Sequence, residues 1–311
     1  MRAGWLKRSK PLAELHFGRN YSCDYGAVEQ VAPGIRRVTA RNPSKFTFKG
    51  TGTYILGTGK VAVIDAGPDL PDHVDALLSA LDGEEITHQL ITHTHTDHSP
   101  AAAAVKKRTG AATYGFGPHG AGRFPDGVPM EAGGDMDFVP DHTVAHGDII
   151  EAAGTQIECV HTPGHTSNHI CFALAGSGAL FTGDHVMGWS TTVVSPPDGD
   201  MAAYMASLEL LASRGDKIYY PTHAGPITDP TPYVAALIEH RREREHQIMD
   251  CLGRGVGRIA DMVGEMYPGL DPELVSAAGR SVFSHIIAMA ERGDIIADGP
   301  IAADGDYRKV N

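Results

Sequence analysis

The chain has 311 residues, of which 42% are hydrophobic and 21% are charged, proportions that exclude a disordered or fibrous protein. Its 38 acidic and 26 basic residues give a formal charge of −12, which argues against non-specific binding to nucleic acid or to an anionic membrane. Seventeen histidines are the compositional exception, and they are either scattered over the surface or gathered in a metal site.

The start of the chain and its cysteines predict a cytoplasmic protein that is not attached to a membrane. Basic residues in the segment 1–10 are followed by Pro11-Leu12-Ala13-Glu14, where a signal peptide would carry its apolar core. No run approaches the ~20 apolar residues of a membrane span. The four cysteines form no CxxC pair, so we expect four reduced thiols.

Along the first 227 residues, short apolar runs bounded by glycine predict strands, and runs with a helical period predict helices. The expected strands cover residues 53–56, 61–64, 86–92, 113–114, 155–160, 170–174, 179–182 and 217–220. The expected helices cover residues 72–81, 101–107 and 201–211. Residues 115–142 are rich in Gly and Pro and show no period, which predicts a lid or a mobile connector.

From Asp229-Pro230-Thr231-Pro232 onward the pattern becomes mostly helical. We expect a first helix of about twenty residues, two more over 259–266 and 274–290, and a short strand over 294–297. The chain is therefore divided into a first domain, residues 1–227, and a small helical domain, residues 228–311. The second domain is expected to cover a pocket or to mediate a homodimer.

The most informative motif lies at residues 92–99, which read Thr-His-Thr-His-Thr-Asp-His-Ser and follow a predicted strand. Alternate residues at a strand end point to the same side, so His93 and His95 face one way. Imidazole and carboxylate are ligands suited to zinc, manganese or iron. Because gathering and desolvating these groups without a cation is unfavourable, the motif predicts a metal site.

Three other predicted strands also end in potential ligands. The segments from His161 to Thr166, from Phe181 to His185 and from Tyr220 to His223 each follow or complete a strand pattern. Strand ends are where α/β scaffolds commonly assemble functional side chains, so these segments are expected to join the same site.

Together these motifs resemble the metallo-β-lactamase-fold hydrolase superfamily. The run His93-Thr94-His95-Thr96-Asp97-His98 matches its HxHxDH signature, and Gly-His-Thr, Gly-Asp and late His motifs follow in the expected order within residues 33–227. The resemblance implies an α/β fold, namely a four-layer αββα sandwich with the site along one edge of its two sheets.

The resemblance also implies a dinuclear metal centre. Its ligands would be His93, His95 and His165 at the first ion, Asp97, His98 and His223 at the second, and Asp184 between them. Two zinc ions are the first expectation, with Mn²⁺ or Fe²⁺ as alternatives. A water shared by the two ions would become a hydroxide nucleophile, which Asp97 would orient and whose proton it would accept. Asp97 and Asp184 are therefore the expected catalytic residues.

Six more residues are expected close to these ligands. They are Asp65, His169, His185, Trp189, Thr191 and Thr192. By resemblance Asp65 orients the ligand loops, and His169 or His185 either supports a ligand or acts on the substrate. By contrast, His119, His142 and the mixed-charge run 239–246 are expected to face solvent.

A finer resemblance is to the branch of the superfamily that contains β-lactamase-like protein 2, an endoribonuclease. It rests on residues 50–54, 191–193 and 240–248 and on a C-terminal, winged-helix-like domain. Two positions depart from the pattern. Gly52 stands where the branch usually has Asn, and Ala224 follows the last histidine where the family has Gly, which leaves that backbone less free.

Three functions remain open from the sequence. The first is metal-dependent hydrolysis of an ester, a thioester or a related small-molecule acyl substrate. The second is cleavage of single-stranded RNA, although residues 228–311 contain nine Arg and Lys against fourteen Asp and Glu, a poor platform for nucleic acid. The third is a mononuclear-iron oxygenase or an inactive binding module, which the complete set of seven ligands argues against. We therefore expect a metal-dependent hydrolase of an acyl substrate.

Overall fold

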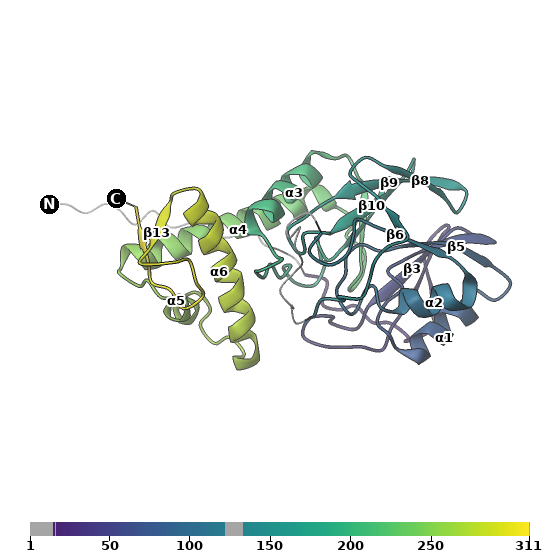
Figure 1. The fold of residues 1–311 in the computed structure, drawn as a ribbon, viewed down its shortest axis with the longest axis horizontal. Helices are drawn as coiled ribbons and strands as arrows, with labels where there is room; N and C mark the ends of the chain where they lie inside the picture. The colour runs from purple at the N-terminus through teal and green to yellow at the C-terminus, as the bar shows by residue number, and fades with distance from the viewer. Residues whose placement is uncertain (1–14, 16, 122–132, 311) are drawn as a thin grey trace.

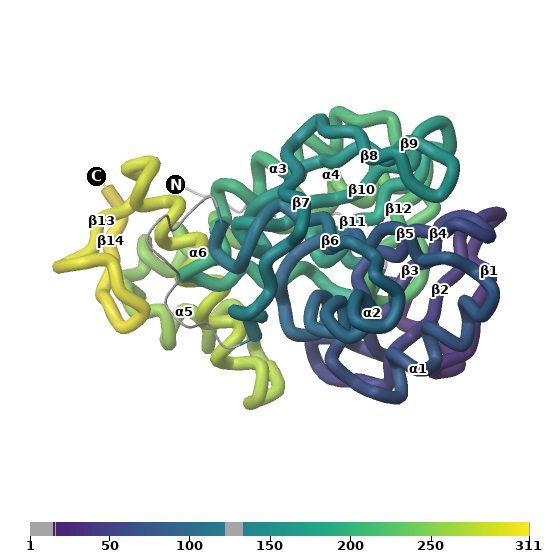
Figure 2. Tube along the Cα trace, turned by 45° about the vertical axis from the view of Figure 1, so that its right-hand side comes forward, coloured from purple at the N-terminus to yellow at the C-terminus, as the bar shows by residue number. Residues whose placement is uncertain are grey.

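Two β-sheets lie face to face between layers of helices, and a mostly helical region extends from one end of this sandwich (Figure 1). The structure is a computed structural model that describes residues 15, 17–121 and 133–310. Residues 259–310 lie at the opposite end of the molecule from the strands and helices of the first half (Figure 2).

The first sheet has seven strands arranged in chain order. They are β1 (Val28–Ala32), β2 (Ile35–Thr39), β3 (Gly52–Leu56), β4 (Lys60–Ile64), β5 (Glu85–Leu90), β6 (Ala112–Gly115) and β7 (His142–Thr143). Neighbours from β1 to β4 are antiparallel, whereas β4 to β7 run parallel. The carboxyl ends of the parallel strands therefore share one edge of the sheet.

The second sheet has five strands in the order β12, β11, β10, β9, β8. They are β8 (Ile149–Ala152), β9 (Thr155–His161), β10 (Ile170–Leu174), β11 (Ala179–Gly183) and β12 (Ile218–Pro221). Only β11 and β12 pair in parallel, so both deliver the chain to the same end of this sheet.

Alternation along the strands builds a core on both faces of the first sheet. In β3, Tyr54 and Leu56 are buried between the two sheets, whereas Ile55 is buried on the outer face. The helices α1 (Pro71–Ala80) and α2 (Ala101–Thr109) cover that outer face.

The outer face of the second sheet is covered in the same way. Leu180 of β11 shares a buried cluster with Leu208 of α3 (Met201–Ser213) and Leu237 of α4 (Pro230–Gly253). The predicted α/β fold with four layers, αββα, is therefore confirmed.

The C-terminal region adds a small core of its own. After α4 it contains α5 (Ile259–Met266), the 3₁₀ turn η1 (Pro272–Leu274), α6 (Val275–Glu291) and the strand pair β13 (Ile295–Ala297) and β14 (Tyr307–Lys309). Ile248 of α4, Met262 of α5 and Ile286 of α6 are buried together. The proposed division at residues 227 and 228 falls in the loop before α4, and the winged-helix character of this region remains a prediction.

The sequence patterns recovered most elements but missed five strands, namely β1, β2, β7, β8 and β14. Arg36 and Arg37 interrupt the apolar alternation of β2, yet Arg37 is only 1% exposed and pairs with Glu29 of β1 at 2.8 Å. All four cysteines are free. Within the described residues, no helix is both long and apolar enough to cross a membrane.

Candidate metal centre

The predicted ligands come from loops that begin at the carboxyl ends of four strands. His93, His95, Asp97 and His98 follow β5, His165 follows β9, Asp184 follows β11, and His223 follows β12. Because β5 lies in the first sheet and the other three strands lie in the second, only packing of the two sheets brings these loops together.

Three imidazoles form one group of converging donors. The Nδ1 atom of His95 lies 3.0 Å from Nε2 of His93 and 3.0 Å from Nε2 of His165. These are the three residues predicted to hold the first ion.

The second group consists of Asp97, His98 and His223. Oδ2 of Asp97 lies 3.3 Å from Nε2 of His98 and 3.3 Å from Nε2 of His223. Asp184 lies between the groups, because its carboxylate oxygens are 3.8 Å from His165 Nε2, 3.6 Å from His98 Nε2 and 3.4 Å from His223 Nε2. The seven predicted ligands are thus brought together.

These separations suit divalent cations. Two donors each ~2.0–2.1 Å from a tetrahedral zinc ion lie about 3.3–3.4 Å apart, close to the distances within both groups. Two buried atoms that face this space, Nε2 of His98 and Oδ1 of Asp184, make no hydrogen bond in the structure. Buried polar atoms normally have partners, so their orientation favours a bound cation as the partner.

The opposite nitrogens of the imidazoles are held by hydrogen bonds, as is usual for metal-binding histidines. The Nδ1 atom of His165 lies 2.6 Å from the carbonyl of Val193, and that of His223 lies 3.0 Å from the carbonyl of Gly50. Since a carbonyl can only accept, both Nδ1 atoms carry the hydrogen and both Nε2 atoms are left to bind a cation.

Asp65 organises several of these loops from a buried position behind the ligands. Its carboxylate accepts hydrogen bonds from the backbone and side chain of Thr92 and from the side chain of Thr222, at 2.8–3.0 Å. It also lies 2.9 Å from Nδ1 of His98. Asp65 therefore connects the β5 loop to the β12 loop, in agreement with the role that the resemblance implies.

The charges at the site favour occupation by a cation. Burial alone would lower the pKa of His223, but the carboxylates of Asp184 and Asp97 outweigh it and raise that pKa to about 10. At His95, burial and the neighbouring His165 lower the pKa to about 3. The His95 end thus presents neutral donors, while the Asp184 end attracts either a proton or a metal ion.

A family model described as the metallo-beta-lactamase superfamily matches residues 48–223, a span that covers more than half of the chain and includes all seven predicted ligands. The chain belongs to the metallo-β-lactamase superfamily. The predicted family is therefore confirmed.

Relatives at moderate identity include two fungal enzymes. The chain is 32% identical over 278 residues to the atrochrysone carboxyl ACP thioesterase nsrC of Aspergillus novofumigatus, covering 88% of this chain and 75% of that relative. It is 28% identical over 291 residues to the atrochrysone carboxyl ACP thioesterase of Aspergillus terreus, covering 88% and 83%. The chain is therefore an enzyme of the metallo-β-lactamase fold.

A solved structure extends the likeness of fold into the C-terminal region. A β-lactamase domain protein from Burkholderia ambifaria matches with a TM-score of 0.76 at 19% identity, over 92% of this chain and 94% of its own. Since the alignment covers 92% of the chain, the likeness of fold includes most of the residues after β12.

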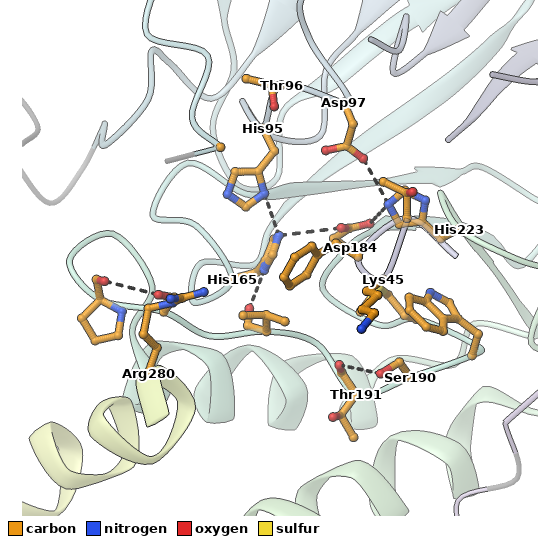
Figure 3. A pocket seen from close by; sticks show the side chains of 18 of the residues that line it. Lys45, His95, Thr96, Asp97, His165, Asp184, Ser190, Thr191, His223 and Arg280 are labelled. Carbon is orange, nitrogen blue, oxygen red and sulfur yellow. Dashed lines mark hydrogen bonds and ion pairs between the residues drawn. The ribbon is translucent and has the colours of Figure 1, made fainter. Parts of the chain in front are cut away.

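A cavity of about 630 Å³ opens in front of the predicted ligands (Figure 3). One side of it is formed by His95, Asp97, His165, Asp184 and His223. The apolar part of its other walls consists of Phe46, Met187, Trp189, Val193, Pro196 and Pro197. Polar side chains also line these walls, namely Lys45, Thr47, Thr96, Ser190, Thr191, Ser195 and Arg280. The site can therefore hold a substrate with a polar reacting group and an apolar body.

Of the six residues expected beside the ligands, only Trp189 and Thr191 line this cavity. Thr192 is buried, and its hydroxyl donates to the carbonyls of Asp184 and His185 at 2.8 and 3.0 Å. His169 is fully buried and accepts a hydrogen bond from the backbone N–H of Asp184 at 3.2 Å. His185 is also fully buried, so neither histidine is available to a substrate.

Two expectations of solvent exposure were wrong. His119 is 4% exposed, because it packs behind the β5 loop with Nδ1 2.9 Å from the hydroxyl of Thr94. Arg241, within the run 239–246, is 3% exposed and donates to the carbonyl of Thr192. His142 is exposed as expected. In both cases the residue lies in a polar stretch of sequence that is typical of a surface, but it is buried because it hydrogen-bonds to a distant segment of the chain.

The Gly- and Pro-rich segment contributes to the site at its end. Thr96 N–H donates to the carbonyl of Gly133 at 2.8 Å, and Gly133 lines the cavity. Residues 122–132, on which much of the expected lid falls, lie outside the described residues. The described part of the segment therefore packs against the HxHxDH loop.

The two departures from the branch pattern have local consequences. Ala224 adopts a φ of +71°, which costs a non-glycine residue about 1–2 kcal/mol. The carbonyl of Ala224 accepts a hydrogen bond of 2.5 Å from the buried guanidinium of Arg37. At Gly52, a Cβ would come within 2.6 Å of the Arg37 side chain. Arg37 thus occupies the space that a larger residue would need and supports the strained turn after His223.

Proposed function

We propose that this enzyme is a metal-dependent thioesterase that hydrolyses an acyl thioester at a dinuclear centre. The first ion would be held by His93, His95 and His165, the second by Asp97, His98 and His223, with Asp184 between them. The proposal takes its reaction class from relatives that are named ACP thioesterases.

The observation that carries the proposal is the convergence of seven donors, five of which line one side of a cavity with apolar walls. Such a cavity accepts an acyl chain along its walls while its carbonyl faces the donors. When bound, two divalent ions supply Lewis acidity toward that carbonyl and lower the pKa of water. Zinc fits the set of nitrogen and oxygen donors, and Mn²⁺ or Fe²⁺ would also fit.

The residues of the chain would then position and deprotonate the attacking water. The Asp97 side chain is 23% exposed toward the cavity, and its Oδ2 accepts a hydrogen bond of 3.0 Å from Thr51. Its carboxylate can therefore orient a water and take up its proton. Asp184 would hold the two cation positions in register, because its oxygens face histidines of both groups.

The surroundings of the donors favour a thioester over an ester or a phosphodiester. A thiol, with a pKa of ~8.5, leaves as a thiolate without help from an acid, whereas an alkoxide needs a proton donor. His169 and His185, the two candidates for such a donor, are fully buried away from the cavity. Of the acyl substrates considered, a thioester is therefore the one whose leaving group can depart from this site without a proton donor.

The test is elemental analysis of the purified protein, followed by a panel of substrates assayed with the metal that is found. We expect hydrolysis of a hexanoyl thioester, its loss on treatment with a chelator, and its return with Zn²⁺. The matched hexanoyl oxyester should react more slowly.

Three outcomes would overturn the proposal. They are no thioester hydrolysis by the metal-loaded protein, cleavage of single-stranded RNA in its place, or one iron per chain with oxygen consumption on a persulfide.

A further inference from the structure

The C-terminal region contributes one cation to the cavity. Arg280 of α6 is exposed and lines the cavity together with the predicted ligands. Figure 3 shows it rising from its helix toward the cavity on a different side from Asp97 and His223. A substrate that reaches the metal centre can therefore extend toward Arg280.

The guanidinium of Arg280 has donors to spare. Its one described side-chain partner is the hydroxyl of Ser276, 2.8 Å away and one helical turn earlier. Within residues 17–121 and 133–310, no carboxylate forms an ion pair with it. The other cation of the cavity, Lys45, is already paired with Asp271 and Glu273 at 2.8 and 2.6 Å. Among the described residues, Arg280 is thus the cation of this cavity that no carboxylate neutralises, and most of its five N–H donors are left for a ligand.

The helix that carries Arg280 is held firmly beside the cavity. Val282 and Ile286, in the next two turns of α6, are at most 1% exposed, and Ala288 joins the core that α3 and α4 share with the second sheet. Lys45, from the loop before β3, forms ion pairs with Asp271 and with Glu273 of η1, just ahead of α6. These contacts fix the helix from which the guanidinium extends.

We propose that Arg280 is a specificity-determining residue that binds an oxyanion group of the thioester substrate. The inference rests on the proposed thioesterase function. A planar guanidinium binds carboxylate and phosphate through two parallel hydrogen bonds. The oxyanion is either a phosphate on the thiol arm or a carboxylate on the acyl chain.

Four thioesters separate these two sources. Hexanoyl and adipoyl groups, which differ by a terminal carboxylate, are each joined to pantetheine and to 4′-phosphopantetheine. Hydrolysis is measured for the natural protein, Arg280→Gln, Arg280→Lys and the control Arg242→Gln. Arg242 is an exposed residue of α4 that pairs with Glu209 and does not line the cavity.

We expect Arg280→Gln to raise KM about tenfold or more for the thioesters with the recognised oxyanion, because a hydrogen bond to a charged group is lost. The kcat should change little, KM for hexanoyl-pantetheine should be unchanged, and Arg280→Lys should recover part of the loss. Sensitivity of both phosphopantetheine substrates would identify the thiol arm, and sensitivity of both adipoyl substrates the acyl chain.

Equal KM values for the natural protein and Arg280→Gln on all four thioesters would overturn the inference, and so would an equal loss on all four. Both results leave thioester hydrolysis by the natural protein intact. Failure of the natural protein to hydrolyse any of the four would instead count against the proposed function itself.

Discussion

Two regions of this chain combine histidines with carboxylates, but they arrange these groups differently. One is the candidate metal centre. The other lies between α4 and α6 and consists of His240, Arg241, Glu245 and His285, which we call the helical polar cluster. His285 is 2% exposed, and its Nδ1 lies 3.5 Å from Oε1 of Glu245.

Donor atoms converge in the first region and not in the second. The described residues contain three groups of potential ligands in which all donor atoms lie within 4.8 Å of one another. All three groups belong to the metal centre. Both ring nitrogens of His285 are buried without a hydrogen bond, yet they join no such group. Convergence of donors, rather than burial or the number of histidines, therefore distinguishes a candidate metal site.

Neighbouring charges separate the two regions further. In the metal centre, the carboxylates of Asp97 and Asp184 outweigh burial and raise the pKa of His98. In the helical polar cluster, burial and then the guanidinium of Arg241 lower the pKa of His240 to about 3. The carboxylates favour a cation in the first region, whereas the charge of Arg241 disfavours one in the second.

The largest effect is expected from Asp184→Asn, which removes a negative charge 3.4 Å from His223 and 3.6 Å from His98. Hydrolysis should fall by more than the ~10–100-fold that loss of an outer hydrogen-bond partner costs, and bound metal should decrease. Elemental analysis and thioester hydrolysis measure both. Glu245→Gln makes the same chemical change in the helical polar cluster and should alter neither. Equal metal content in the two variants would contradict the difference between the regions.

Asp65→Asn should have the next largest effect. Asp65 has a φ of +53°, which Asn tolerates, so the substitution tests charge and acceptor capacity rather than backbone strain. Because Asp65 orients His98, Thr92 and Thr222, we expect metal affinity to fall ~10–100-fold. Competition with a chromogenic chelator measures that affinity. An unchanged metal affinity would show that Asp65 only holds the backbone of its neighbouring loops and does not orient a ligand.

Arg241→Met tests the link between the regions. The buried guanidinium of Arg241 donates to the carbonyl of Thr192, whose hydroxyl binds the carbonyl of Asp184. Loss of this hydrogen bond should lower kcat about tenfold, since a charge-assisted bond contributes about 1.5–3 kcal/mol. Metal content should stay the same, and Arg241→Lys should restore part of the rate. Hydrolysis by Arg241→Met at the natural rate would exclude the link.

The smallest effect concerns pH and stability. His240 has a lowered pKa of about 3 in the folded protein, so below its unfolded pKa of ~6.5 the unfolded chain binds the extra proton. The free energy of unfolding is therefore unaffected by this group well above pH 6.5 and decreases as the pH falls below that value, because protonation of His240 favours the unfolded chain. Between pH 6.5 and 5.5 the loss should be about 1 kcal/mol.

The substitution His240→Leu removes that loss. Urea unfolding at both pH values should show a smaller decrease for His240→Leu than for the natural protein. Parallel decreases would mean that His240 takes up its proton in the folded state too.

The sequence alone identified the strand ends and the spacing of the HxHxDH motif, because strand alternation and ligand chemistry are local. It also identified Asp184 and His223, since each follows a short apolar run that reads as a strand. Arg36 and Arg37 concealed β2, because a charged residue paired across a sheet looks, in the sequence, like one that faces solvent.

What only the tertiary structure decided is which side chains share a cavity. His169 and His185 lie within a few residues of predicted ligands but are turned into the core, while Arg280, nearly sixty residues beyond His223, reaches the cavity. Phe46 and Lys45 come to it from a loop with no recognisable motif. The histidines of the opening composition were therefore enough to indicate the chemistry, but the substrate contacts depend on how α6 and the sheets pack, and packing between distant segments leaves no local pattern.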